Sequence, residues 1–428
     1  MYKNFEEFLA KEYKIDEAII KLCLDAESEI TPVFAEIDET AQYNTLKVLR
    51  AMQKNKLSEA HLASTTGYGY NDIGRDVLEA IYADVFGAEI SLVRPQLISG
   101  THALYVALSG NLRFGDELLS PAGKLYDTLE GVIGVRKTKN SLAENGITYK
   151  QVNLKPDGGF DFDALEKAIG KNTKMAAIQR SRGYDMRRSF TPQEIKELIS
   201  FIKSVKPDII CMVDNCYGEF TGIAEPGNAG ADLTVGSLIK NPGGGIAPTG
   251  GYITGREQYV ENAADRLTAP GIGREIGPGL GSVRHMLQGF FLAPNVVAGC
   301  LKGAVFASKV FERLGYEVSP RPDEKRSDIV QSVSFKSKEE LISFCEGIQY
   351  AAPVDSFAKA QPAPMPGYVH DVIMAAGAFI QGASIELSAD APLREPYTAY
   401  LQGGLSWHHA KIGIIAGVGK LKREGFIR

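Results

Sequence analysis

Short apolar runs alternate with helix-like segments between about residues 87 and 255 of this chain. Met175–Ile178 and Ile209–Val213 have the length and bulk of strands that are buried on both faces of a sheet. Similar short runs are Leu97–Ile98, Glu117–Leu119, Leu233–Val235 and Gly251–Thr254. Because strands that alternate with helices are typical of a mostly parallel sheet, this region predicts an α/β domain.

The pattern changes on either side of this region. The first 60 residues predict helices with apolar positions among mostly polar ones, as in an arm that packs against another surface. A Gly/Pro-rich stretch from Ala269 to Gly281 interrupts the alternation, and Val296 to Leu314 then predicts one long helix. We therefore expect a helical arm over residues 1–60, a large domain over 61–293 and a smaller α+β domain over 294–428.

Composition narrows the class of protein. The 428 residues are 44% hydrophobic and 23% charged with a net charge of -5, which is typical of a globular protein and argues weakly against nucleic acid as a partner. We find no apolar run long enough to span a bilayer, and the acidic start lacks the pattern of a signal peptide. The five cysteines show no spacing for zinc or a disulfide framework. We expect a cytoplasmic protein without nucleic-acid, membrane or metal partners.

Candidate chemistry lies at the ends of two predicted strands. Asp214 follows the run that ends at Val213, and the carboxyl ends of strands are where open α/β sheets collect ligands. Lys240 follows Leu233–Val235 and precedes the breaker run 241–245. An acid so placed can hold a pyridine nitrogen protonated, and such a lysine can form a Schiff base with an aldehyde cofactor. Taken alone, each residue is better explained as a helix cap, for Asp214, or as a surface lysine, for Lys240. With the segments described next, the two predict a pyridoxal phosphate (PLP) site.

Two further segments offer contacts to such a cofactor. Ser99, Gly100, Thr101 and His102 lead into a helix-like stretch, whose start offers backbone N–H groups and a hydroxyl to a phosphate. An ordinary helix cap is the alternative. Tyr126 follows the next predicted strand and can stack its ring on a flat heteroaromatic group, although it is also explained as an ordinary loop tyrosine.

The order of these segments resembles the fold-type I PLP enzymes, and among them the cystathionine and methionine C–S lyases. The spacings from Thr101 to Tyr126 and from Asp214 to Lys240 are close to that family's pattern. The resemblance runs from about residue 60 to the end. It is closest to the methionine γ-lyase-like group often labelled aluminium resistance proteins, because residues 68–79 and 394–397 look like that group in particular.

The resemblance implies a large domain with a mostly parallel seven-stranded sheet and a smaller C-terminal α+β domain. It implies PLP bound to Lys240, with Asp214 at the ring nitrogen and Ser237 in the place of a phosphate-binding serine. The implied reaction is elimination of a thiol from a sulfur-containing amino acid, as in methionine γ-lyase or cystathionine β-lyase. Two alternatives stay open: another PLP reaction such as transamination or aldol cleavage, and a PLP-fold binding or stress-resistance protein with little turnover.

The chain departs from the better-known lyases at two places. Ile239 stands directly before the lysine, where those enzymes usually carry a hydroxyl residue. Residues 178–184 replace their acidic residue and Asn-Pro pair, so the partner of the cofactor's phenolic oxygen is open. Arg180 or Arg182 is a candidate for positive charge there, and we also expect Arg180 to contact the substrate, although a solvated basic loop explains at least one of them.

Other candidates concern the substrate and the subunits. Arg394 can pair bidentately with a substrate carboxylate, and Arg274, Arg321 and Arg326 compete for that role. In the related lyases, an arm carries a tyrosine and an arginine to the neighbouring subunit's phosphate. By resemblance, Tyr68, Tyr70 or Arg75 does so here, and local packing of the turn is the alternative. We therefore expect a homodimer or homotetramer with sites at the interface.

Overall fold

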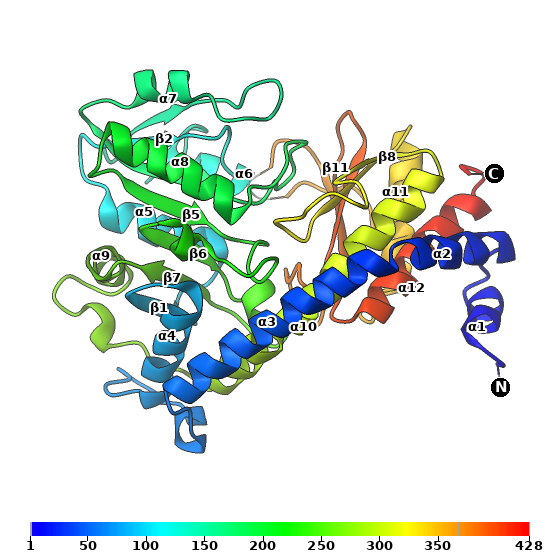
Figure 1. The fold of residues 1–428 in the computed structure, drawn as a ribbon, viewed down its shortest axis with the longest axis horizontal. Helices are drawn as coiled ribbons and strands as arrows, with labels where there is room; N and C mark the ends of the chain where they lie inside the picture. Colours follow the sequence, from blue (N-terminus) through cyan, green and yellow to red (C-terminus); the bar gives the residue numbers. More distant parts are fainter. Residues whose placement is uncertain (1, 366–367, 428) are drawn as a thin grey trace. The chain divides into compact units, whose positions relative to one another are not determined.

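The computed structural model describes residues 2–365 and 368–427, and the chain divides into two compact units (Figure 1). The larger unit contains Tyr43–Gly183 and Arg187–Ala293, and the smaller contains Met1–Gln42, Tyr184–Met186 and Pro294–Arg428. The smaller unit thus resumes at residue 294, where the sequence places a boundary. The expected arm over residues 1–60 is divided between the two units and forms no unit of its own.

The larger unit contains a seven-stranded sheet in the order β1-β7-β6-β5-β4-β2-β3. Strand β7 runs antiparallel to β1 and β6, and the other neighbours pair in parallel, which confirms the predicted mostly parallel sheet. The carboxyl ends of β4, β5 and β6 lie side by side, because Asp214 pairs with Gln179 on one side and with Val235 on the other. The strands are β1 (Ile90–Arg94), β2 (Glu117–Ser120), β3 (Thr148–Gln151), β4 (Thr173–Gln179), β5 (Ile210–Asp214), β6 (Leu233–Ser237) and β7 (Gly251–Gly255).

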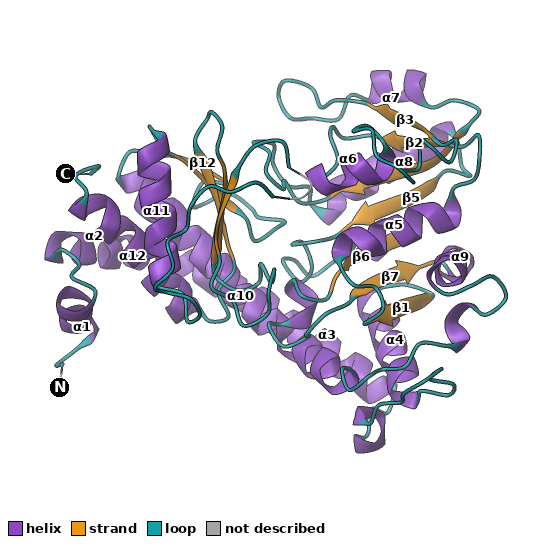
Figure 2. Cartoon of the chain, turned by 180° about the vertical axis from the view of Figure 1, so that it is seen from behind, coloured by secondary structure: helices purple, strands orange, loops and turns teal. Residues whose placement is uncertain are grey.

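Helices cover both faces of this sheet (Figure 2). Met212 of β5 packs in the core that includes α5 and α9, while Cys211 and Val213 pack in the core that includes α8. Burial on both faces explains why these strands are continuous apolar runs in the sequence. The helices of this unit are α4 (Ile73–Phe86), α5 (Gly100–Asn111), α6 (Asp127–Ile133), α7 (Phe162–Ala168), α8 (Pro192–Val205) and α9 (Glu257–Leu267), with short 3-10 helices at Glu59–Leu62, Pro226–Ala229, Asn241–Gly243 and Gly273–Glu275.

The smaller unit contains a five-stranded antiparallel sheet and helices, as the predicted α+β domain requires. Its strands follow the order β10-β11-β12-β9-β8, and its core unites the N-terminal helices with α11 and α12. The strands are β8 (Glu317–Ser319), β9 (Gln331–Ser334), β10 (Val372–Ala375), β11 (Ser388–Pro392) and β12 (Thr398–Gln402). The helices are α1 (Phe5–Glu12), α2 (Glu17–Glu29), α11 (Lys338–Tyr350) and α12 (Trp407–Arg423), while α3 (Thr31–Lys54) and α10 (Val283–Arg313) contain residues of both units.

Helix α10 differs from its sequence-based prediction. It runs through Pro294, although the sequence predicted a helix start only at Val296. Within the described residues, α10 is also long and apolar enough to cross a membrane by length and composition, so the expectation that no such run exists is wrong. However, 78% of the most apolar 18-residue stretch of this helix is buried inside the fold, as in the core helix of a globular domain.

Candidate active site

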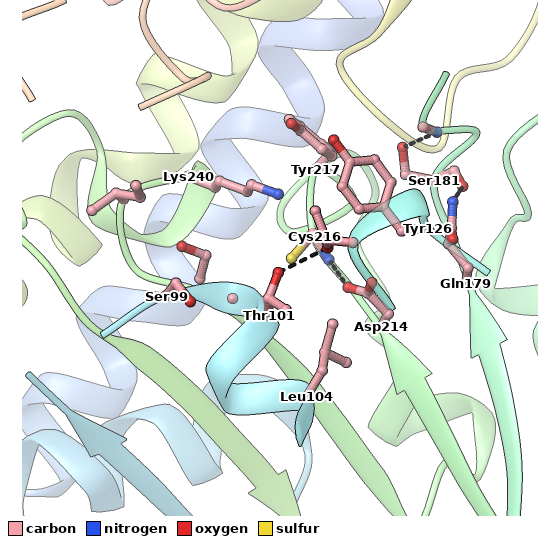
Figure 3. Close-up of a pocket in the computed structure, with 15 residues that line it drawn as sticks. Ser99, Thr101, Leu104, Tyr126, Gln179, Ser181, Asp214, Cys216, Tyr217 and Lys240 are labelled. Carbon is pink, nitrogen blue, oxygen red and sulfur yellow. Dashed lines mark hydrogen bonds between the residues drawn. The ribbon is translucent and has the colours of Figure 1, made fainter. Parts of the chain in front are cut away.

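A cavity lies at the carboxyl ends of β4, β5 and β6, beside the start of α5 (Figure 3). The space inside it that a water-sized sphere can reach is about 180 Å³. All of its lining residues belong to the larger unit. They are Ser99, Gly100, Thr101, Leu104, Tyr126, Thr128, Gln179, Ser181, Gly183, Asp214, Cys216, Tyr217, Ser237, Ile239 and Lys240. The structure therefore brings together the predicted lysine, acid, tyrosine, serine and helix start.

Lys240 reaches the cavity from the turn after β6. This turn is tight, because a Cβ on Gly243 would lie only 1.7 Å from the carbonyl oxygen of Leu238. The Nζ of Lys240 lies 4.1 Å from the ring centre of Tyr217 and 6.0 Å from that of Tyr126. Withdrawal from bulk water lowers the pKa of this amine, but the acidic groups of Cys216, Tyr217 and Asp214 outweigh it, and the net pKa is raised.

Tyr217 forms part of the wall next to this amine. Its backbone has φ = 70°, a left-handed conformation that is rare for a bulky residue. A bond from the N–H of Gly218 to the carbonyl of Asn215, at 2.9 Å, closes the turn that holds it. The strained turn thus fixes the aromatic ring beside Lys240, and no pattern in the sequence indicated this residue.

Asp214 is the last residue of β5, and its side chain is buried. Its Oδ1 accepts the N–H of Cys216 at 3.1 Å. Burial raises the pKa of the Asp214 carboxyl, and the opposing effects of Lys240 and Cys216 do not fully offset this. A buried carboxylate with few donors is a suitable partner for a cationic group of a ligand.

The start of α5 forms the end of the cavity that suits a phosphate group. Ser99 caps the helix by accepting the N–H of His102 at 3.1 Å, and the hydroxyls of Thr101 and Thr128 lie 2.9 Å apart. The hydroxyl of Ser237 is buried and has no hydrogen-bond partner among the described residues. A Cβ on Gly100 would lie 3.2 Å from the Ser237 Cβ, so a side chain there would crowd this space. A helix N-terminus beside an unsatisfied hydroxyl group is a natural anion site.

The residues that line this cavity fit PLP. The orphaned Ser237 hydroxyl and the start of α5 suit a phosphate, Asp214 suits a ring nitrogen, and Lys240 suits an aldehyde carbon. Tyr126 offers an aromatic face in the same cavity.

Two predicted contacts do not line the cavity. The Nδ1 of His102 instead accepts the N–H of Ile98 at 3.3 Å, and burial lowers the pKa of its ring. The guanidinium of Arg180 is buried and donates to Asn215 at 2.7 Å and Thr221 at 3.2 Å, with Glu225 3.4 Å away. Because these groups occupy the guanidinium, the expected role of Arg180 as a substrate contact does not agree with the structure.

Gln179 lines the cavity where the sequence suggested an arginine. Its amide donates to the carbonyl of Ser181 at 3.0 Å, and its Oε1 is buried without a partner in the described parts of the chain. Gln179 ends β4 in register with Asp214, so its place at a strand end was the signal that could have identified it. Thr128, Ser181, Cys216 and Tyr217 also line the cavity and were not predicted.

Tyr68, Tyr70, Arg75 and Arg394 are not among the residues that line the cavity. Tyr68 and Tyr70 are 70% and 61% exposed. Arg75 is buried and donates to the carbonyls of Gly69 and Gly277, which contradicts the expectation that it reaches outwards. Arg394 belongs to the smaller unit, where its Nη2 donates to the Tyr184 carbonyl at 3.2 Å.

Comparisons with known proteins agree with this geometry. A family model described as methionine gamma-lyase matches residues 19–422. A carbon-sulfur lyase involved in aluminum resistance from Clostridium novyi NT is 50% identical with a TM-score of 0.94, and the match covers 98% of this chain and 100% of that one. The uncharacterized protein YnbB of Bacillus subtilis (strain 168) is 52% identical over 413 residues, which span 96% of this chain and 98% of the relative. The predicted resemblance is thereby confirmed.

A more distant structure shows how widely the fold is shared. The pyridoxal-5'-phosphate dependent protein YhfS from Escherichia coli is 18% identical with a TM-score of 0.59, and the match covers 89% of this chain and 95% of that one. At this identity the likeness shows the fold alone. That fold is the predicted one of a PLP-dependent enzyme.

Proposed function

The chain belongs to the methionine gamma-lyase family, and we propose that it is a PLP-dependent carbon–sulfur lyase acting on a sulfur-containing amino acid. The observation that carries the proposal is the convergence of Lys240, Asp214 and the unsatisfied Ser237 hydroxyl in one cavity at the strand ends. The Clostridium novyi relative, whose name is carbon-sulfur lyase, supports the reaction class.

Each residue has a distinct binding task in this proposal. The backbone at Gly100 and Thr101, with the Ser237 hydroxyl, holds the phosphate at the start of α5. Asp214 keeps a proton on the ring nitrogen, and Tyr126 supports the ring face. Lys240 holds the cofactor covalently through Nζ. When bound, PLP supplies an electron-withdrawing ring that stabilises negative charge on the substrate α-carbon.

Lys240 also moves protons in the reaction. With PLP and an amino acid bound, the Nζ of Lys240 would be placed to take the proton from the α-carbon and to deliver a proton to the departing sulfur. The bond between carbon and sulfur then breaks, its electron pair leaves with sulfur, and sulfur gains a proton to depart as a thiol. One water hydrolyses the remaining unsaturated amine to a 2-oxo acid and ammonia.

Product analysis tests this proposal. We expect the purified enzyme, given a panel of sulfur-containing amino acids, to release thiol, 2-oxo acid and ammonia in equal amounts. Pyruvate would indicate β-elimination, and 2-oxobutanoate would indicate γ-elimination. Amino-group transfer without ammonia would favour a transaminase, and cofactor binding without turnover would favour a binding protein. Either of these outcomes contradicts the lyase assignment.

We also propose that the site is completed by a second copy of this chain. Tyr68 and Tyr70 are the candidates, because both rings are largely exposed and lie 5.5 Å apart on the surface of the larger unit. A two-fold dimer would contain two equivalent composite sites. The role of Arg394 as a substrate contact stays a prediction, since its guanidinium suits a carboxylate.

Subunit mixing tests the composite site. Lys240→Ala and the Tyr68→Ala/Tyr70→Ala double variant should each have little activity alone. In an equal mixture whose subunits exchange freely, about half of the dimers contain one chain of each variant. One of the two sites in such a dimer has both an intact Lys240 and intact tyrosines, so about a quarter of wild-type activity should return. Mass spectrometry of differently labelled chains provides the control for exchange. Exchange without any recovery would show that each chain builds its own site.

For localisation we propose a reducing cytoplasm. All five cysteines are unpaired and buried, which suits a compartment where thiols stay reduced.

A further inference from the structure

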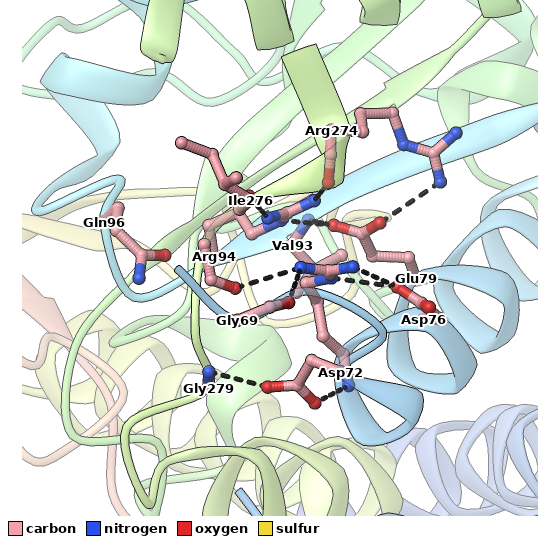
Figure 4. Close-up of polar contacts among 12 residues, drawn as sticks. Gly69, Asp72, Asp76, Glu79, Val93, Arg94, Gln96, Arg274, Ile276 and Gly279 are labelled. Atoms are coloured by element: carbon pink, nitrogen blue, oxygen red, sulfur yellow. Dashed lines mark hydrogen bonds and ion pairs between the residues drawn. The ribbon is translucent and has the colours of Figure 1, made fainter. Parts of the chain in front are cut away.

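Two glycine-rich loops of the larger unit, residues 64–72 and 273–281, are joined to each other (Figure 4). The N–H of Gly277 donates to the carbonyl of Tyr68 at 2.9 Å. The contact is close, because a Cβ on Gly69 would lie 2.6 Å from the Cα of Pro278. Gly69 also has φ = 67°, so this position requires glycine twice over. The two loops therefore form one surface element, called here the double loop.

Asp72 and Arg75 tie the double loop together from inside. The Nη1 of Arg75 donates to the carbonyls of Gly69 at 2.8 Å and Gly277 at 3.3 Å, one in each loop. The carboxylate of Asp72 accepts the N–H of Gly279 at 2.9 Å and the hydroxyl of Thr65. Arg75 is 5% exposed and Asp72 is 1% exposed, so breaking these bonds leaves buried groups without partners.

A buried ion pair supports the second loop. The Nε of Arg94 lies 2.6 Å from Glu79 Oε1, and its two other nitrogens donate to the carbonyls of Ile276 at 2.6 Å and Arg274 at 3.1 Å. A Cβ on Gly277 would lie 2.4 Å from Arg94 Nη1. A buried ion pair contributes little net stability compared with apolar residues, and its consequence here is a defined loop geometry. The amide of Gln96 adds one bond to the carbonyl of Pro278 at 2.9 Å.

The outer side of the double loop has the opposite character. Tyr68, Tyr70 and Leu280 are 70%, 61% and 60% exposed. Polar groups inside the double loop thus hold its backbone in place, while aromatic and apolar side chains are exposed on its outer side. Fixing the backbone in advance lowers the entropy lost when displayed side chains bind.

We propose that Asp72, Arg75 and the Glu79–Arg94 pair are positioning residues that hold the Tyr68–Tyr70 turn in the conformation required by the cofactor site of a second copy of this chain. The inference rests on the composite site proposed above. It assigns Arg75 to the interior of its own chain instead of the neighbour's phosphate.

The first experiment uses Arg75→Lys, which keeps the charge but loses the planar guanidinium that holds both carbonyls through Nη1 and Asp76 through Nε at 2.8 Å. We expect cofactor to bind at least about tenfold more weakly in titrations of cofactor-free protein, which corresponds to loss of one charged hydrogen bond. Amide hydrogen exchange in peptides covering residues 64–72 and 273–281 should accelerate. Arg256→Lys is the matched control, because Arg256 is 59% exposed in the same unit and pairs with Asp232. Gln96→Ala provides a milder second variant if Arg75→Lys does not fold.

The decisive measurement repeats the substitution in the Tyr68→Ala/Tyr70→Ala background. If Arg75 acts through the tyrosines, Arg75→Lys should cause no further loss of cofactor affinity there. An undiminished further loss, or unchanged affinity and exchange in the single variants, overturns the positioning role. Wild-type affinity in the tyrosine variant overturns the composite site and this inference with it. Failure of the wild-type protein to bind PLP at all overturns the proposed function itself.

Discussion

Lys240→Ala should abolish lyase turnover, with a loss of at least about 1,000-fold, and should remove the covalently held cofactor. Among the described residues, Lys240 is the only lysine that lines the cavity, so no other amine there can take over its role. Borohydride treatment of the wild-type protein should fix a pyridoxyl group on the peptide that contains Lys240, as identified by mass spectrometry. The fold should persist, as judged by far-UV circular dichroism, because the side chain points into a cavity instead of a packed core.

Lys124→Ala is a suitable control for this result. Lys124 lies in the same unit but forms ion pairs with Asp127 and Glu130 outside the cavity lining. This variant should retain both turnover and trapping. A pyridoxyl group found on Lys124, Lys174 or any other lysine would show that Lys240 is not the attachment site.

The second large effect should come from Asp214→Asn. We expect turnover to fall by about 100-fold or more while cofactor still binds, because a neutral amide cannot stabilise a protonated ring nitrogen. Asparagine keeps an oxygen that can accept the Cys216 N–H, which Asp214 accepts at 3.1 Å. The local turn should therefore survive. Steady-state kinetics and a cofactor titration measure the two quantities separately.

Asp208→Asn is the matched control, since Asp208 is exposed just before the same strand. It should leave turnover unchanged. Near-normal turnover in Asp214→Asn would mean that this carboxylate does not serve the ring nitrogen, and would reduce its role to holding the turn at Cys216.

The sequence predicted the sheet because its signals are local. A strand buried on both faces must be apolar throughout, so β4, β5 and β6 were visible as short runs between helix-like segments. Glycine and proline mark the turn after Lys240 for an equally local reason, since Gly243 approaches Leu238 too closely for any side chain. Asp214 and Lys240 could be predicted because they stand at or just after the ends of these strands.

The predictions that failed depend on partners far along the chain. The guanidinium of Arg180 donates hydrogen bonds to Asn215, Thr221 and Glu225, and no residue close to Arg180 in the sequence predicts these partners. Arg75 is held inside by the nearby carbonyl of Gly69 and by the carbonyl of Gly277, which is 202 residues away. Helix α10 continues through Pro294, although proline alone predicts a boundary.

By itself, the sequence determined which residues stand at the strand ends and at the helix start of the site. It therefore identified the lysine, the acid and the helix start that suits a phosphate. Only the tertiary structure decided which other side chains face the cavity: Tyr217 does, while His102 and Arg180 do not. The physical reason is that backbone periodicity is set by neighbours in the chain, whereas the direction and hydrogen-bond partners of a polar side chain are set by whatever the fold packs against it.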